Sequence, residues 1–123
     1  MSDQRLPASD IVAQREYFVK DAIPPMVIIA RIGMPRKRAD GRYECGAELQ
    51  EPAMTTLRYM NGVDAFEAIQ LALVVLGVDL KHINEQLDGA LCWQQSNQGV
   101  GLPSYPDFSL SEMLGASFKF QGT

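Results

Sequence analysis

The feature of the sequence that most constrains the fold is a series of apolar residues between Asp64 and Leu87, spaced alternately three and four apart. This spacing places them along one side of an α-helix. Asp64 and Glu67 fit a capping box, in which side-chain oxygens accept hydrogen bonds from the first amides. We predict one helix over Asp64–Leu87, although Gly77 is also compatible with two shorter helices. The predicted core stripe comprises Phe66, Ile69, Leu73, Leu76, Leu80, Ile83 and Leu87.

The residues before this helix alternate in the manner of β-strands separated by turns. In the best example, Arg42–Gln50, the residues Cys45, Ala47 and Leu49 face inward and Glu44 and Glu48 face a solvated side. Short connections favour antiparallel pairing. We therefore predict the α+β class: an antiparallel β-meander of 4–5 strands with one long α-helix packed across one face. The predicted strands are Ile11–Lys20, Met26–Met34, Arg42–Gln50, Thr55–Met60 and, less regular, Ala90–Gln95.

The length of 123 residues predicts a single domain over residues 1–123. Residues 1–9 are polar and are expected to form a flexible N-terminus, and the glycines and prolines of residues 96–108 predict a long loop. Ser109–Leu114 suits one helical turn and Ala116–Phe120 a short strand.

Composition bears on compartment and partner class. The net charge of −4 argues against a dedicated DNA or membrane binder, and no apolar run is long enough to cross a bilayer. Cys45 and Cys92 lie far apart without a metal-binding or redox spacing, so we expect two reduced, buried thiols. Together these features predict a soluble cytoplasmic protein that does not bind membranes.

Several segments resemble a family of small bacterial domains of unknown function. They are the strand Met26–Pro35, the turn at Asp40-Gly41, the strand start Tyr43-Glu44-Cys45, the helix start Asn61–Leu73 and the closing Gly101-Leu102-Pro103. The resemblance covers roughly residues 10–103. It implies a strand–strand–strand–helix order and a bacterial origin, and it brings no catalytic residues with it.

The chain lacks the usual combinations of catalytic residues. His82 is its one histidine and is expected to be exposed on the helix, with Asp79 and Glu85 nearby but not converging on it. Glu44 and Glu48 are most simply part of a solvated sheet face. Gly99-Val-Gly101 lacks the third glycine and the following helix of a dinucleotide site. We predict no enzyme activity, no catalytic residue, no metal site and no cofactor.

Three features suit binding instead. Residues 61–123 contain only Lys81 and Lys119 as basic groups, so this half is acidic and suits a basic partner. A basic turn suits an anion and comprises Arg36, Lys37, Arg38 and Arg42. A second helix stripe suits a partner protein and comprises Leu71, Val74 and Val78, flanked by Asp79 and Glu85.

The second stripe leaves two alternatives open. Either the end of the chain folds over it with Phe108, Leu110, Phe118 and Phe120, or another chain covers it, most simply in a homodimer. The leading functional hypothesis is a non-enzymatic protein-interaction module, in its most concrete form a toxin-neutralising immunity-type protein. The alternative is a nucleic-acid or nucleotide-binding accessory protein that uses the basic turn, although nucleic acid is the less expected partner.

Overall fold

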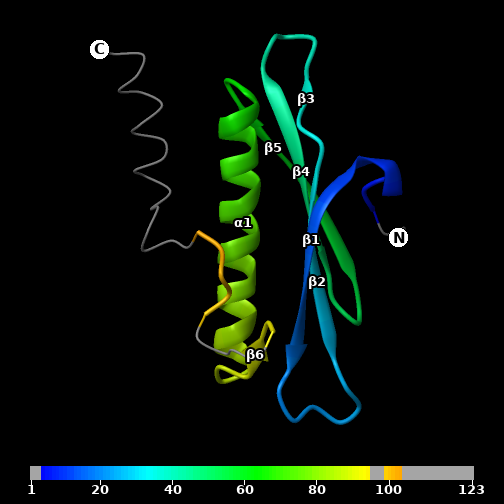
Figure 1. Ribbon diagram of the computed structural model, residues 1–123, viewed down its shortest axis with the longest axis vertical. Helices are drawn as coiled ribbons and strands as arrows, with labels where there is room; N and C mark the ends of the chain where they lie inside the picture. Colours follow the sequence, from blue (N-terminus) through cyan, green and yellow to red (C-terminus); the bar gives the residue numbers. More distant parts are fainter. Residues whose placement is uncertain (1–3, 95–98, 104–123) are drawn as a thin grey trace.

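One long helix lies across one face of an antiparallel sheet in the computed structural model, which describes residues 4–94 and 99–103 (Figure 1). The helix, α1, spans Ala65–Gln86, and a 3-10 turn at Ala8–Asp10 precedes the sheet. This architecture confirms the predicted α+β class. The strands are β1 (Ile11–Val19), β2 (Val27–Gly33), β3 (Arg36–Lys37), β4 (Tyr43–Gln50), β5 (Thr55–Gly62) and β6 (Leu91–Cys92).

The sheet is a meander in which β1 pairs with β2, β4 pairs with both β3 and β5, and β2 and β3 lie one after the other beside β4. Its order is β5–β4–β2–β1–β6, and β3 continues beside β4 where β2 ends. The prediction that Arg36 and Lys37 lie in the basic turn was wrong, because these two residues form β3 and pair with Glu44 and Tyr43. The actual turn is tighter and is closed by the amide of Gly41 donating to the carbonyl of Arg38.

The helix is continuous through Gly77, as the unbroken phase of its apolar residues predicts. Its N-cap is Asp64, whose Oδ1 accepts from the amide of Glu67 at 2.8 Å. Glu67 Oε1 reaches back to the amide of Val63 at 2.9 Å, one residue before the cap. Both carboxylates satisfy amides that have no partner inside the helix.

The buried face of α1 is rotated from the predicted stripe. Leu76 and Leu80 lie in the core as expected, but small residues, Ala68 and Ala72, complete the buried face and let the helix approach β4 and β5 closely. Phe66 was predicted in the core and is 80% exposed instead. At 100° per residue its side chain points about 80° away from Leu76, toward the side of the helix that the sheet does not cover.

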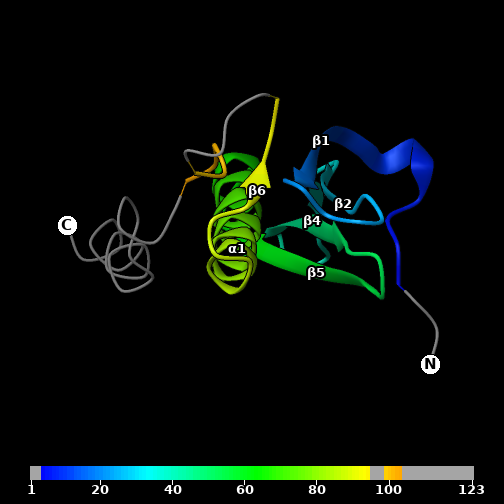
Figure 2. The ribbon, with the colours of Figure 1, turned by 90° about the horizontal axis from the view of Figure 1, so that it is seen from below.

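The opposite face of the sheet is covered in part by the chain before β1 (Figure 2). The expectation of a flexible N-terminus does not hold for Leu6, which is buried and lies over Gly33 and Gly46. A Cβ on Gly46 would come within 2.5 Å of Leu6 Cδ2, so this glycine makes room for the leucine. The expected solvated face is therefore wrong at Glu48, which is 1% exposed.

The remaining predicted strand is shorter than expected. Ala90–Gln95 contributes only the two residues of β6, and residues 99–103 contain neither helix nor strand. The predicted helical turn Ser109–Leu114, the predicted strand Ala116–Phe120 and most of the predicted loop lie outside the described residues.

Candidate functional site

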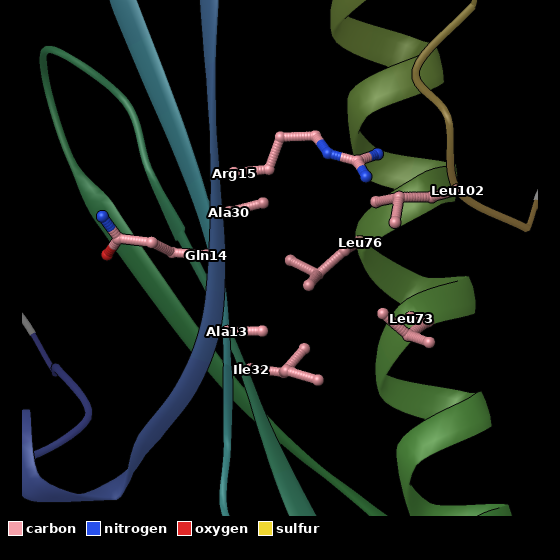
Figure 3. A pocket seen from close by; sticks show the side chains of 8 residues that line it. All are labelled: Ala13, Gln14, Arg15, Ala30, Ile32, Leu73, Leu76 and Leu102. Atoms are coloured by element: carbon pink, nitrogen blue, oxygen red, sulfur yellow. The ribbon is translucent and has the colours of Figure 1, made fainter. Parts of the chain in front are cut away.

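An open apolar groove lies between α1 and the sheet, on the side of β1 and β2 (Figure 3). It exists because α1 packs mainly on β4 and β5, so the helix covers the β1 side of the sheet incompletely. Its volume is about 130 Å³. The lining residues are Ala13, Gln14, Arg15, Ala30, Ile32, Leu73, Leu76 and Leu102.

One end of the groove is closed by the segment Gly99–Pro103, which is tied to β1. Tyr17 Oη donates to the carbonyl of Val100 at 2.5 Å. Arg15 Nη1 donates to the carbonyl of Gly101 at 2.8 Å and to that of Val100 at 3.3 Å. These bonds hold Leu102 against the groove, where Figure 3 shows it beside the helix and below the Arg15 guanidinium.

Two further contacts fix this segment. The guanidinium of Arg15 lies 4.0 Å from the centre of the Trp93 ring, a favourable cation–π distance. The carbonyl oxygen of Pro103 passes over the helix at Gly77, 2.2 Å from where a Cβ would be. The segment can pass this close to the helix only because Gly77 has no side chain, which explains why a glycine lies in the middle of the helix.

The edge of β1 beside the groove carries backbone groups without a strand partner among residues 4–94 and 99–103. There, β6 pairs with β1 only at Phe18 and Val19. The amide of Val19 bonds toward β2, to Met26, and that of Lys20 bonds away from β2. By the alternation of an antiparallel ladder, Gln14 and Glu16 direct their amides and carbonyls to the outer edge.

Successive side chains of β1 point to opposite faces of the sheet. Ala13 and Arg15 point to the helix side, whereas Gln14 points to the far side of the sheet (Figure 3). An added strand would therefore gain backbone bonds at the edge and face the groove with every second side chain. Sequence reasoning missed this site, because no pattern in the chain shows that the helix lies off the centre of the sheet.

The residues that the sequence marked for partner binding do not line this groove. Val74 is only 6% exposed, so it offers no accessible surface. Leu71 and Val78 are half-buried and Glu85 is exposed. Asp79 forms an ion pair with Arg58 at 2.9 Å, on the opposite side of the helix from the groove.

The basic residues expected to bind an anion are partly neutralised. Arg36 forms an ion pair with Asp10, and Arg38 lies 3.4 Å from Asp40. Lys37 and Arg42 are exposed at the same end of the sheet. Because two of these cations have carboxylate partners, the local positive charge is smaller than the sequence indicates.

A second, polar hollow lies between β5 and the second half of α1. It brings together Asp79 and the exposed His82, with a volume of about 240 Å³. Its other lining residues are Leu49, Glu51, Thr56, Arg58, Ile83 and Gln86. Within the described ranges, no group of three or more His, Cys, Asp or Glu side chains is placed to hold a metal ion.

The buried polar residues serve the fold. Glu48 Oε2 lies 2.6 Å from Arg31 Nη1, and its Oε1 accepts from the amide of Leu6 at 2.6 Å. Neither Glu48 nor Glu44 lines the polar hollow that contains Asp79 and His82. Burial raises the pKa of the Cys45 thiol, whose Sγ donates to the carbonyl of Gly33, so it stays protonated near neutral pH.

A family model described as a domain of unknown function (DUF6968) matches residues 13–104. It spans the strands, the helix and the segment that closes the groove. No curated protein and no solved structure is significantly similar to the chain. Within the part of the chain that the structure describes, no helix is both long enough and apolar enough to cross a membrane.

Proposed function

Because the chain belongs to this family of domains of unknown function, its role has to be inferred from its own surface, and we propose that it is a protein-binding module. The observation that carries the proposal is the apolar groove beside the edge of β1, which has no strand partner there among residues 4–94 and 99–103. The proposed ligand is an extended peptide segment of a partner protein, with apolar side chains at alternate positions.

The chemistry of the groove supports this ligand. Ala13, Ala30, Ile32, Leu73 and Leu76 supply methyl and methylene groups to the groove, and a small apolar side chain buried there gains about 25 cal/mol per Å². Arg15 is the charged residue of the lining, and carbonyls and an aromatic ring already occupy its guanidinium. The lining therefore favours an aliphatic or aromatic side chain over a charged one.

The edge of β1 supports an extended conformation of the ligand. The outward backbone groups of Gln14 and Glu16 can each donate and accept one hydrogen bond from an added strand. Main-chain bonds supply affinity in this mode of recognition, and the groove supplies selectivity for the alternate side chains. A β-bulge between Ile11 and Ala13 ends the regular ladder, so the added strand is short.

In its more specific form, the proposal is an immunity-type protein that neutralises a toxin by covering it in the bacterial cytoplasm. The small size, the net charge of −4 and the acidic second half support this form. It predicts that the natural partner is basic around the apolar segment that enters the groove.

The test is selection of phage-displayed random dodecapeptides on the full chain, followed by affinity measurement for the selected peptides. We expect enrichment of peptides with apolar residues at alternate positions. Ala13→Arg fills the groove and should weaken their binding at least about tenfold. Val27→Arg is the matched control, because this β2 side chain is 44% exposed and is not among the residues that line the groove.

A second variant separates edge binding from groove binding. Glu16→Pro removes one outward amide without removing a bond to β2, so it should weaken the selected peptides while leaving the sheet paired. Far-ultraviolet circular dichroism and urea unfolding confirm that each variant is folded. Failure to enrich any peptide, or equal affinity for wild type and Ala13→Arg, would refute the proposal.

A further inference from the structure

We infer that residues 104–123 of the same chain form an intramolecular ligand that occupies the groove when no partner is bound. This inference rests on the proposed function and adds regulation to it. A partner would then bind only by displacing this segment, which the sequence shows directly after Pro103.

The point at which this segment begins supports the inference. Leu102 already lines the groove, and Pro103 is held over Gly77 on the helix that forms one wall. The bonds from Tyr17 and Arg15 to Val100 and Gly101 keep this starting point in place. The segment therefore starts two residues after Leu102, beside the wall of the groove that α1 forms.

The composition of the segment matches the ligand expected for the groove. It contains two pairs of apolar residues at alternate positions, Phe108 with Leu110 and Phe118 with Phe120. In a strand, the members of each pair point to the same side. At about 3.3 Å per residue, the five residues from Pro103 to Phe108 can span roughly 16 Å when extended. This equals the length of α1 between Gly77 and Phe66 at about 1.5 Å per residue, so Phe108 can reach along the groove.

Tethering makes such a ligand effective even when its intrinsic affinity is low. A short peptide tether gives the segment that it links an effective concentration of the order of mM. A segment that binds with a dissociation constant near 0.1 mM as a free peptide would therefore occupy the groove about nine-tenths of the time when tethered. A partner peptide would then bind roughly tenfold more weakly to the intact chain than to an unoccupied groove.

The experiment compares methyl NMR spectra of the full chain with those of a full-length quadruple variant, Phe108→Ser, Leu110→Ser, Phe118→Ser and Phe120→Ser. We expect shifts at the groove methyls of Ala13, Ile32, Leu73 and Leu76. The Leu57 methyls are the control, because they lie beside Gly46 on the far face of the sheet. A synthetic peptide of residues 104–123, added to the variant, should reverse the shifts.

Affinity measurements on the same two proteins separate the two proposals. Tighter binding of a selected dodecapeptide to the quadruple variant, by about tenfold, supports the intramolecular ligand. Equal affinity for both proteins, with unshifted groove methyls, overturns it and leaves the proposed function standing. Shifts confined to Leu71 and Val78 also overturn it, since they place the segment on the outer side of the helix. Absence of any dodecapeptide binding to either protein, even when the groove methyls shift, refutes the proposed function instead.

Discussion

The hydroxyl of Tyr17 and the carbonyl of Val100 form a buried hydrogen bond of 2.5 Å between residues 83 positions apart in the sequence. Tyr17 is fully buried within β1, and Val100 belongs to the segment that closes the groove. The bond therefore connects the sheet to a segment that has no strand or helix of its own, and it sets where the groove ends.

Removal of this hydroxyl should weaken the closure of the groove. Tyr17→Phe keeps the ring and is expected to lower the free energy of unfolding by about 1 kcal/mol. The loss is moderate because Arg15 still donates to the Val100 carbonyl. Urea unfolding followed by the fluorescence of Trp93, the single tryptophan, measures it. Tyr59→Phe, at a half-exposed site, is the control and should change stability by less than about 0.5 kcal/mol.

The raised pKa of Tyr17 should make the protein less stable at alkaline pH. Burial raises the pKa of Tyr17 above the ordinary tyrosine value of 10.0, and the nearby Arg15 offsets part of that increase. Above that value the unfolded chain loses a proton that the folded chain keeps, so the free energy of unfolding falls as pH rises. Cys45 acts in the same direction because burial also raises its pKa. Urea titrations between about pH 9 and pH 11 should give a steeper fall for wild type than for Tyr17→Phe; parallel profiles would contradict this explanation.

The buried ion pair of Arg31 and Glu48 should matter more than the exposed pair of Arg58 and Asp79. Glu48→Gln leaves the Arg31 guanidinium, 16% exposed, without its charge partner and is expected to cost about 3 kcal/mol. Asp79→Asn removes a pair whose arginine is 46% exposed and should cost less than about 1 kcal/mol. Thermal or urea unfolding of the two variants provides the comparison. Equal losses would show that the cover supplied by Leu6 does not exclude water from Glu48.

Gly77→Ala should destabilise this protein, although the same substitution stabilises an isolated helix. Alanine favours a helix over glycine by about 1 kcal/mol. Here its Cβ would lie 2.2 Å from the Pro103 carbonyl oxygen, so the closing segment has to move. We expect a net loss of stability and a shift of Trp93 emission, whereas the exposed Lys81→Ala should leave the emission unchanged. A more stable Gly77→Ala protein with wild-type emission would mean that the segment does not cross there.

The exposed position of Phe66 can be tested against Leu80 on the same helix. Phe66→Ser removes a side chain that is already 80% in solvent and should cost less than about 1 kcal/mol. Leu80→Ala opens a cavity in the core and should cost about 2–5 kcal/mol. Urea unfolding distinguishes the two, and a large loss for Phe66→Ser would place this side chain against another part of the chain.

Local patterns were sufficient for the elements themselves. The three-four spacing predicted one helix with its N-cap at Asp64, and the alternation of Arg42–Gln50 predicted a strand with Cys45, Ala47 and Leu49 inward. These features depend on neighbours within a few residues, for which the repeat of a helix or strand determines the side-chain direction. For the same reason Gly77 did not break the helix.

The site was decided by tertiary structure. Ala68 and Ala72, weak signals in a hydrophobicity pattern, place α1 close to β4 and β5, so Phe66 lies in solvent and the β1 side remains open. The strand pattern predicts a solvent-facing Glu48, but Leu6, which is distant in the sequence, covers it in the structure. The sequence alone determined the helix, the main strands and their antiparallel class, because short-range periodicity sets them. Only the packing of distant segments decided the lateral position of the helix on the sheet, and with it the groove beside β1, because close packing depends on side-chain volumes brought together by the whole fold.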